Sequence, residues 1–283
     1  MRLAMFRRRA RAVVAMATEG GFRGLGEDEA AYPGSLEALI AAGADLGAVA
    51  QRLAGAPLLD PSTLEFLPPL ARPGKILCVG LNYRDHAAET DAGIPAAPEI
   101  FVRFPSTLVA HSAAIVLPAL SEQLDYEGEL VAVIGKGGRA IAREDALRHV
   151  VAYSVFNDAS VRDYQFRTRQ WTMGKNFDRT GAFGPWLVTA DELPAGAAGL
   201  RLTTFLNGAL VQEASTADLV FDVASLIEFI SAAMTLEAGD LIVTGTPAGV
   251  GFARKPPLWM RAGDRVEVEI ERIGRLSNPV AAQ

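Results

Sequence analysis

The stretch that decides the architecture is Leu124-Asp125-Tyr126-Glu127-Gly128-Glu129-Leu130, which runs directly into the apolar residues 131–134. We interpret it as a strand, in which the side chains of Glu127 and Glu129 point to the same face. Their Cα atoms are then roughly 6.6 to 7 Å apart. Buried carboxylates at that spacing need a proton, a cation or a metal ion to compensate their charge. We interpret the pair as part of a metal site.

A second set of alternating acidic residues is expected to be exposed to solvent. In the segment 265–271, three glutamates alternate with valine and isoleucine, which is typical of a half-buried strand whose acids lie in water. Glu127 and Glu129 instead precede a run that is apolar on both faces, and Gly128 between them presents no side chain. The contrast favours burial of the Glu127–Glu129 pair.

A third oxygen ligand is expected from Asp158. It follows the largely apolar run 150–157, at the point where a strand is expected to leave the core. Three carboxylates without cysteine or histidine donors favour a hard ion, Mg²⁺ or Mn²⁺, over zinc. Ordinary surface acids are the alternative that spacing alone leaves open.

One of the three histidines lies in a setting suited to proton transfer. His86 belongs to the polar loop 80–89, with Glu89 three residues after it. One helical turn would bring this carboxylate against the imidazole, which would raise its basicity and fix its tautomer, as a general base requires. His111 and His149 are expected to be structural. A solvated His–Glu pair on a surface turn is the alternative for residues 86 and 89.

Lysine is rare in this arginine-rich chain, which has only four lysines. Lys175 lies in the glycine-containing polar segment 172–176. A compact ammonium group can stabilise an oxyanion or enolate more flexibly than the planar guanidinium of arginine. We therefore expect a chemical role for Lys175, with an exposed loop lysine as the alternative.

The overall composition excludes some classes of protein. The 283 residues carry a net charge of −6 and no basic block, and nucleic-acid binding needs clustered Lys and Arg. The single cysteine, Cys78, excludes an internal disulfide framework and fits a reducing compartment. No stretch approaches the roughly 18 apolar residues of a membrane-spanning helix. We place the protein in the cytoplasm, with no nucleic-acid or membrane partner.

The N-terminal part of the chain has the pattern of a small α/β unit. Strands are expected at 2–6 and 12–17, and Ser35 and Asp45 are suitable N-caps for two short helices. The proline-rich stretch 57–73 then resembles a linker. These features predict a small N-terminal domain.

The rest of the chain consists mainly of short β-rich runs. They cover 75–80, 107–116, 129–135, 150–156, 184–189, 200–206, 240–244 and 265–271. One clear helix, 222–234, follows the 3.6-residue period with Asp222 as its N-cap. We expect domains at 1–70 and 71–283, and an α+β fold that is mostly β, with a sandwich or roll rather than a doubly wound sheet.

Six sequence blocks in order resemble the fumarylacetoacetate hydrolase superfamily, and in particular its bacterial acylpyruvate hydrolase-like members. The blocks are GLNYRDHAAE at 80–89, LDYEGELVAVIGK at 124–136, FNDASVRDYQ at 156–165, GKNFDRTGAFGPW at 174–186, TLEAGDLIVTGTPAGVG at 235–251 and GDRVEVEIERIGRLSNPV at 263–280. The resemblance covers most of the chain from Lys75 to Val280, and the N-terminal unit is similar to the small domain of many bacterial members.

The resemblance implies a mixed β-sandwich roll, homodimers, and 2-oxo or 2,4-dioxo acid substrates. It also implies a His86–Glu89 dyad on a mobile loop, 82–91. The residues that it assigns to the divalent metal are Glu127, Glu129 and Asp158, and those that it assigns to substrate contact are Arg162, Gln165, Lys175 and Thr246. The chain departs from many relatives in the loop 176–185, which affects substrate identity more than the metal site.

Our leading hypothesis is a Mg²⁺- or Mn²⁺-dependent hydrolase that cleaves a carbon–carbon bond in acylpyruvates such as fumarylpyruvate or maleylpyruvate. The products would be pyruvate and a carboxylic acid. His86, oriented by Glu89, would activate water, and Lys175 would stabilise the enolate. The enzymatic alternative is a decarboxylase or tautomerase/isomerase of 2-oxo dicarboxylates such as oxaloacetate or 2-hydroxyhepta-2,4-diene-1,7-dioate. A metal-stabilised scaffold without catalytic activity is the alternative from another class.

Overall fold

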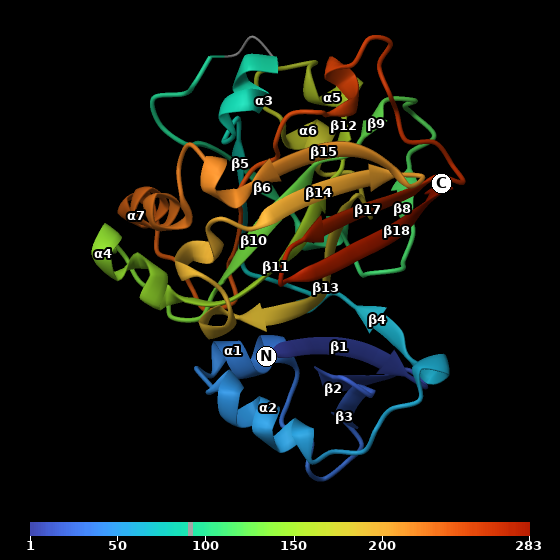
Figure 1. Ribbon diagram of the computed structural model, residues 1–283, viewed down its shortest axis with the longest axis vertical. Coiled ribbons are helices and arrows are strands. Elements are labelled where there is room, and N and C mark those ends of the chain that lie inside the picture. The colour runs from blue at the N-terminus through green and yellow to red at the C-terminus, as the bar shows by residue number, and fades with distance from the viewer. Residues whose placement is uncertain (90–92) are drawn as a thin grey trace.

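A long mixed sheet runs through the computed structural model, which describes residues 1–89 and 93–283 (Figure 1). In spatial order its main strands are β3 (Gly21–Gly26), β2 (Arg11–Thr18), β1 (Arg2–Arg8), β13 (Gly181–Thr189), β11 (Val150–Asp158), β10 (Gly128–Ile134), β16 (Leu241–Val243), β5 (Ile76–Gly80) and β6 (Glu99–Arg103). Two short strands join it at the side, β4 (Glu65–Leu67) beside β1 and β7 (Leu108–Val109) beside β13.

The second sheet packs against the middle of the first. Its order is β15 (Ala209–Ser215), β14 (Arg201–Leu206), β17 (Arg265–Ile270), β18 (Gly274–Ala282) and β8 (Ile115–Leu117). Leu130 of β10 and Val268 of β17 belong to the same buried core. The mostly β, α+β sandwich predicted from the sequence is therefore confirmed.

The two sheets approach closely beside the Glu-Gly-Glu segment. A Cβ atom on Gly128 would lie 2.2 Å from Oγ1 of Thr204 and 3.0 Å from Cγ1 of Val268. Any side chain at this position would push the sheets apart. The glycine between the two glutamates is therefore required by packing.

The N-terminal strands continue the main sheet. Arg2 and Leu3 of β1 pair with Val188 and Leu187 of β13, so the first part of the chain shares its sheet with the rest. The expected helices are present as α1 (Leu36–Ala41) and α2 (Leu46–Ala54), with Ser35 and Asp45 accepting hydrogen bonds at their N-termini. The division at residues 70 and 71 stays a prediction.

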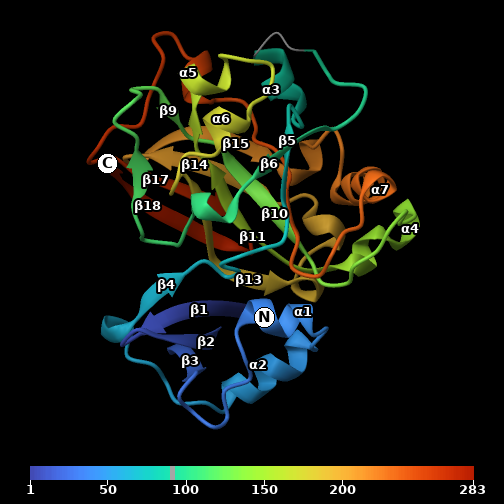
Figure 2. The same ribbon diagram turned by 180° about the vertical axis from the view of Figure 1, so that it is seen from behind.

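Short helices and a small sheet gather at the end of the molecule opposite the N-terminal unit, as both ribbon views show (Figure 1, Figure 2). They are α3 (Arg84–Glu89), α5 (Arg162–Gln165), α6 (Thr172–Lys175), and the strands β9 (Leu124–Asp125) and β12 (Ser160–Val161). Residues 84–89 of the expected mobile loop are helical, whereas residues 90 and 91 lie outside the described residues.

Two helices lie at the side of the molecule. The expected helix 222–234 is present as α7 (Val223–Ala233), and α4 (Arg143–Ala146) lies next to it. Nδ1 of His149, just after α4, hydrogen bonds the carbonyl of Lys136 at 2.7 Å. This contact gives that histidine the structural role expected from the sequence.

The expected continuous strand 107–116 is wrong. The chain forms β7 and β8 with a turn between them, in which Ser112 has a positive φ of 66°. The N–H of Ser112 donates to the carbonyl of Ser277, and that of Ser277 donates to Nδ1 of His111. These contacts with β18 bend the chain away from an extended path. The strands β3, β4, β6, β12, β15 and β18 were not anticipated.

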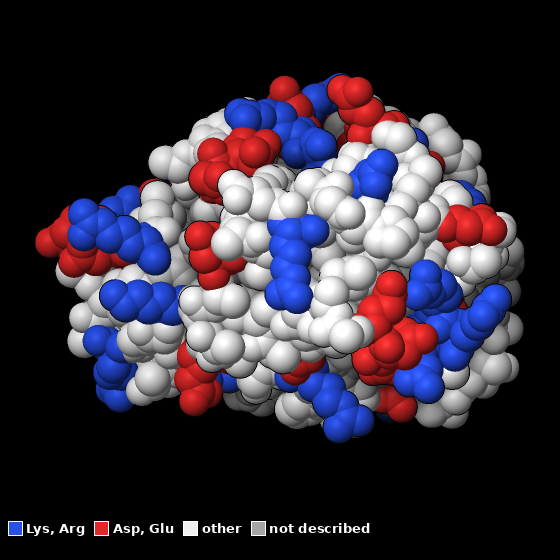
Figure 3. Space-filling model, turned by 90° about the horizontal axis from the view of Figure 1, so that it is seen from below, with Lys and Arg blue, Asp and Glu red and all other residues white. Residues whose placement is uncertain are grey.

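Acidic and basic side chains are interspersed on the face at the N-terminal end (Figure 3). Among the described residues, none of the helices is long and apolar enough to cross a membrane.

Removing the N-cap of α7 tests its contribution to stability. The carboxylate of Asp222 accepts a hydrogen bond from the N–H of Ser225 at 2.8 Å and pairs with Arg143 at 2.6 Å. Asp222→Ala should lower the free energy of unfolding in urea at neutral pH by about 1 kcal/mol. Asp222→Asn is the matched control, because asparagine can still cap the helix.

The stabilisation that Asp222 provides should depend on pH. Burial opposes ionisation of Asp222, but the hydrogen bonds from Ser225 and the charge of Arg143 outweigh it and lower its pKa. The stabilisation should be present above the ordinary pKa of aspartate and lost as the pH falls through the lowered value. Equal losses of stability in Asp222→Ala and Asp222→Asn at neutral pH would show that the N-cap hydrogen bond is not the source of the stabilisation.

Candidate active site

Three buried carboxylates meet where β10 begins and β11 ends. One oxygen from each of Glu127, Glu129 and Asp158 lies within 4.8 Å of the others. The strand register causes this meeting, because Gly128 pairs with Asn157 and the N–H of Asp158 donates to the carbonyl of Glu127. The structure therefore brings together the three acids that the sequence predicted as metal ligands.

Two of the three carboxylates have cationic partners. Nζ of Lys175 lies 2.5 Å from Glu127 and 2.7 Å from Asp158. Arg162 pairs with Glu127 at 2.7 Å, and the buried Arg103 pairs with Asp158. Lys175 itself is almost completely buried, so the alternative of an exposed loop lysine is wrong.

Asp125 was not predicted from the sequence as a site residue, although it lies in the segment 124–130 with Glu127 and Glu129. This buried carboxylate accepts hydrogen bonds from Arg162 at 2.9 Å and from the backbone N–H groups of Gly251 and Phe252. It fixes Arg162 and ties the 251–252 turn to the site. Among the described residues, the buried cluster thus contains four carboxylates and three cations.

Arg103 was also missed, and no local pattern marks it. Its guanidinium donates to Asp158, to the carbonyl of Ala159 and to the hydroxyl of Thr180. These contacts orient one oxygen of Asp158 while Lys175 contacts the other. Arg103 lies on β6, far from Asp158 in sequence, so only the sheet brings them together.

The electrostatics of the two glutamates differ. Burial opposes ionisation of Glu127, but the charges of Lys175 and Arg162 outweigh it and lower its pKa. Burial and the negative charges of Asp158 and Glu127 instead raise the pKa of Glu129 well above its ordinary value. Oxygen Oε2 of Glu129 accepts the N–H of Gly245 at 2.6 Å, which does not balance a full charge.

This arrangement suits a divalent cation. The protein's own cations leave Glu129 undercompensated, and an ion among the three carboxylates would supply the missing positive charge. The donors are oxygen atoms, which hard ions such as Mg²⁺ and Mn²⁺ prefer. Glu127, Glu129 and Asp158 thus fit the metal that the sequence suggested.

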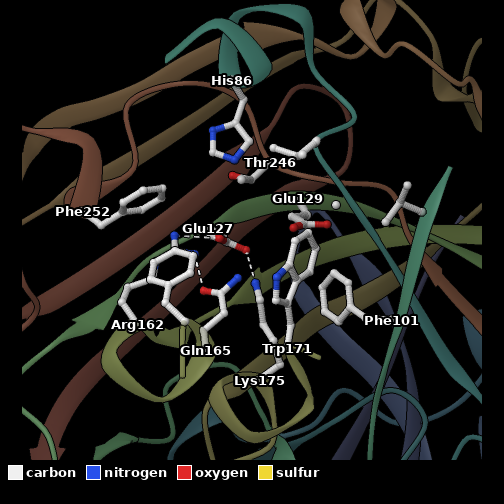
Figure 4. A pocket seen from close by; sticks show the side chains of 14 residues that line it. His86, Phe101, Glu127, Glu129, Arg162, Gln165, Trp171, Lys175, Thr246 and Phe252 are labelled. Carbon is white, nitrogen blue, oxygen red and sulfur yellow. Dashed lines mark hydrogen bonds and ion pairs between the residues drawn. The ribbon is translucent and has the colours of Figure 1, made fainter. Parts of the chain in front are cut away.

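A cavity of about 200 Å³ opens onto Glu127 and Glu129. His86 faces it from α3, on the side opposite Lys175 (Figure 4). The imidazole side chain is 8% exposed, and its Nδ1 lies 3.5 Å from Oε2 of Glu89. Glu89 also accepts the N–H of Gly249 at 3.0 Å. A buried imidazole at the cavity does not match the alternative of a solvated pair.

The remaining expected substrate contacts also line the cavity, but protein groups already bind them. Gln165 accepts a hydrogen bond from Arg162 at 2.8 Å through its amide oxygen. The hydroxyl of Thr246 donates to the carbonyl of Gly128 at 3.0 Å and accepts from Gln212 at 2.8 Å. Their substrate-binding roles stay predictions.

Known proteins resemble this chain over most of its length. The profile described as "Fumarylacetoacetate (FAA) hydrolase C-terminal" matches residues 75–281. Curated relatives include several oxaloacetate tautomerases. One is the mitochondrial oxaloacetate tautomerase Fahd2a of Rattus norvegicus, 40% identical over 264 residues that cover 92% of this chain and 84% of the rat protein.

Solved structures have the same fold over the whole chain. Fumarylacetoacetate hydrolase from Exiguobacterium antarcticum is 38% identical, with a TM-score of 0.87 and complete coverage of both chains. Maleylpyruvate hydrolase from Sphingobium, solved in complex with manganese(II) and pyruvate, is 30% identical with a TM-score of 0.81. That match covers 100% of this chain and 99% of the other.

Titration with Mn²⁺ tests the metal assignment. Glu129→Gln should raise the calorimetric Kd for Mn²⁺ by more than about 100-fold, because loss of a direct ligand should exceed the effect of losing a supporting group. The melting temperature of the metal-free protein should not fall, since the substitution removes an undercompensated buried charge.

Glu271→Gln is the matched control, because Glu271 is exposed at the end of β17. It should bind Mn²⁺ as the unmodified protein does. The same Kd in Glu129→Gln and Glu271→Gln would contradict the assignment of Glu129 as a ligand.

Proposed function

Because the chain belongs to the fumarylacetoacetate hydrolase family, we propose that it is a divalent-metal-dependent tautomerase that interconverts the enol and keto forms of oxaloacetate. One observation carries the proposal: His86, Lys175 and Arg162 line the same cavity as Glu127 and Glu129. The site thus combines a base, cations and a place for a metal ion. The oxaloacetate tautomerases among its relatives support this reaction over the others that such a site allows.

Tautomerisation needs little beyond proton transfer. A proton leaves C3 of the keto acid and a proton is added to the oxygen of C2, so one C–H bond breaks and one O–H bond forms. A single imidazole can perform both transfers, because it accepts and donates protons near neutral pH. His86 would be that base. Its Nδ1 contacts Glu89, which would favour the tautomer that carries its proton on Nδ1 and has Nε2 as the basic nitrogen.

The buried charges would bind and polarise the substrate. Glu127, Glu129 and Asp158 would hold the divalent cation, which when bound would supply Lewis acidity at the 2-oxo group. Arg162 and Lys175 would attract the substrate's carboxylate and stabilise negative charge that develops on oxygen. Both side chains are almost completely buried, where charge interactions are stronger than in water.

Hydrolysis of an acylpyruvate is the second candidate. The dyad of His86 and Glu89 favours it, since an oriented imidazole can take a proton from water. The similar maleylpyruvate hydrolase structure supports it as well. Hydrolysis, decarboxylation and a non-catalytic scaffold stay predictions from the sequence, as do the homodimer and the cytoplasmic location.

Replacement of His86 tests the proposed base. The unmodified protein with Mg²⁺ should speed the decay of the enol absorbance of oxaloacetate above the spontaneous rate. His86→Gln should lower kcat/KM by about 10² to 10⁴ while still binding Mn²⁺. His149→Gln is the matched control, because His149 hydrogen bonds Lys136 and is not among the cavity-lining residues described.

Product analysis separates the candidate reactions. Tautomerisation leaves total oxaloacetate unchanged, decarboxylation releases carbon dioxide, and hydrolysis releases pyruvate from maleylpyruvate. If maleylpyruvate yields pyruvate while the oxaloacetate enol decays at its spontaneous rate, the hydrolase hypothesis replaces the tautomerase. If His86→Gln and His149→Gln have equal activity, His86 is not the base.

A further inference from the structure

Four aromatic side chains line the cavity, and we call them the aromatic collar: Phe101, Phe166, Trp171 and Phe252. They come from separate segments: β6, the residue after α5, the residue before α6, and the turn at 251–253. Phe101 and Trp171 lie on one side of the cavity and Phe252 on the other (Figure 4). The mechanism proposed above uses none of them.

The collar consists of two packed pairs. The rings of Phe101 and Trp171 meet edge to face, with centroids 5.5 Å apart, and those of Phe166 and Phe252 meet at 60° with centroids 5.4 Å apart. Such contacts fix ring positions. Phe166 is nevertheless 55% exposed, so part of this apolar wall faces solvent beside the cavity.

The chain makes room for Trp171 at one specific place. A Cβ atom on Gly80, at the end of β5, would lie 2.3 Å from Cζ3 of the Trp171 ring. With glycine at this position the indole packs directly against the β5 backbone and lines the cavity. Trp171 is thereby held as part of the wall.

Two of the collar rings border the cations of the cavity: Arg162 lies 4.4 Å from the ring centroid of Phe252, and Lys175 lies 4.9 Å from that of Phe101. Arg162 is paired with Asp125 and Glu127, and Lys175 with Glu127 and Asp158. The four collar residues carry no charge. A substrate whose 2-oxo acid head binds beside these paired cations therefore places its distal group among the aromatic rings that border them.

We propose that the aromatic collar binds a planar, uncharged group attached to the 2-oxo acid head, and that Trp171 determines this specificity. The enzyme then enolises aryl-substituted 2-oxo acids as well as oxaloacetate. The reaction rests on the proposed function: the C3–H bond breaks, an O–H bond forms at C2, and His86 carries the proton. Stacking against the collar stabilises the aryl group through ring contacts and burial.

Comparison of phenylpyruvate with oxaloacetate tests this proposal. The unmodified holoenzyme should enolise both acids. Trp171→Ala should lower the ratio of kcat/KM for phenylpyruvate to that for oxaloacetate by about 10-fold, and Trp171→Phe should largely restore it. Trp259→Ala is the matched control, because Trp259 is half-buried and outside the described residues that line the cavity. It should leave the ratio unchanged.

The outcomes separate this proposal from the proposed function. Turnover of oxaloacetate with no turnover of phenylpyruvate, or an unchanged ratio in Trp171→Ala, overturns the collar proposal and leaves the tautomerase standing. If neither acid is turned over, the tautomerase proposal is wrong. The collar proposal is then tested by calorimetric binding of phenylpyruvate to the Mn²⁺-loaded protein. A Kd that rises about 10-fold in Trp171→Ala supports the collar, and an equal Kd overturns it.

Discussion

The structure depends on the balance of buried charge at one end of the main sheet. Asp125, Glu127, Glu129 and Asp158 are all buried, and Arg103, Arg162 and Lys175 are buried against them. Isolated charges in such a place would be very costly, and ion pairs offset that cost only when hydrogen bonds and geometry are good. The pairing is incomplete at Glu129, whose pKa is raised by burial and by its acidic neighbours. That imbalance connects the fold to metal binding.

Strand direction explains why the site assembles at this end. The parallel strands β5 and β16 lead at their C-terminal ends to His86 and to Gly245 and Thr246. The strand β10 is antiparallel to β16 and starts at the same edge, and β11 runs back to finish there at Asp158. Asn82 ties the ends of β5 and β16 together by donating to the carbonyl of Thr244 at 2.7 Å. The three carboxylates thus meet at one end of the main sheet, whereas Arg162 and Lys175 reach them from α5 and α6.

Local sequence rules predicted the parts of the site that local geometry determines. The expected strand through Glu127 is interrupted, because residues 126 and 127 lie between β9 and β10, yet Glu127 and Glu129 meet as the alternation predicted. Glu89 lies one helical turn from His86, and Lys175 stood out by its rarity. Arg103 and Asp125 were missed because their meaning comes from partners distant in the chain, Asp158 and Arg162. The break at Ser112 was missed for the same reason, since contacts with β18 impose it. The fold class was predictable because binary patterning and helix caps are local, whereas the joining of β1 to β13 is not.

Anomalous scattering from crystals grown with Mn²⁺ tests the central claim most directly. The account predicts a single strong peak bounded by carboxylate oxygens of Glu127, Glu129 and Asp158, at the inner end of the cavity that His86 lines. A map with no peak at these carboxylates, or with its strongest peak elsewhere on the molecule, would contradict it.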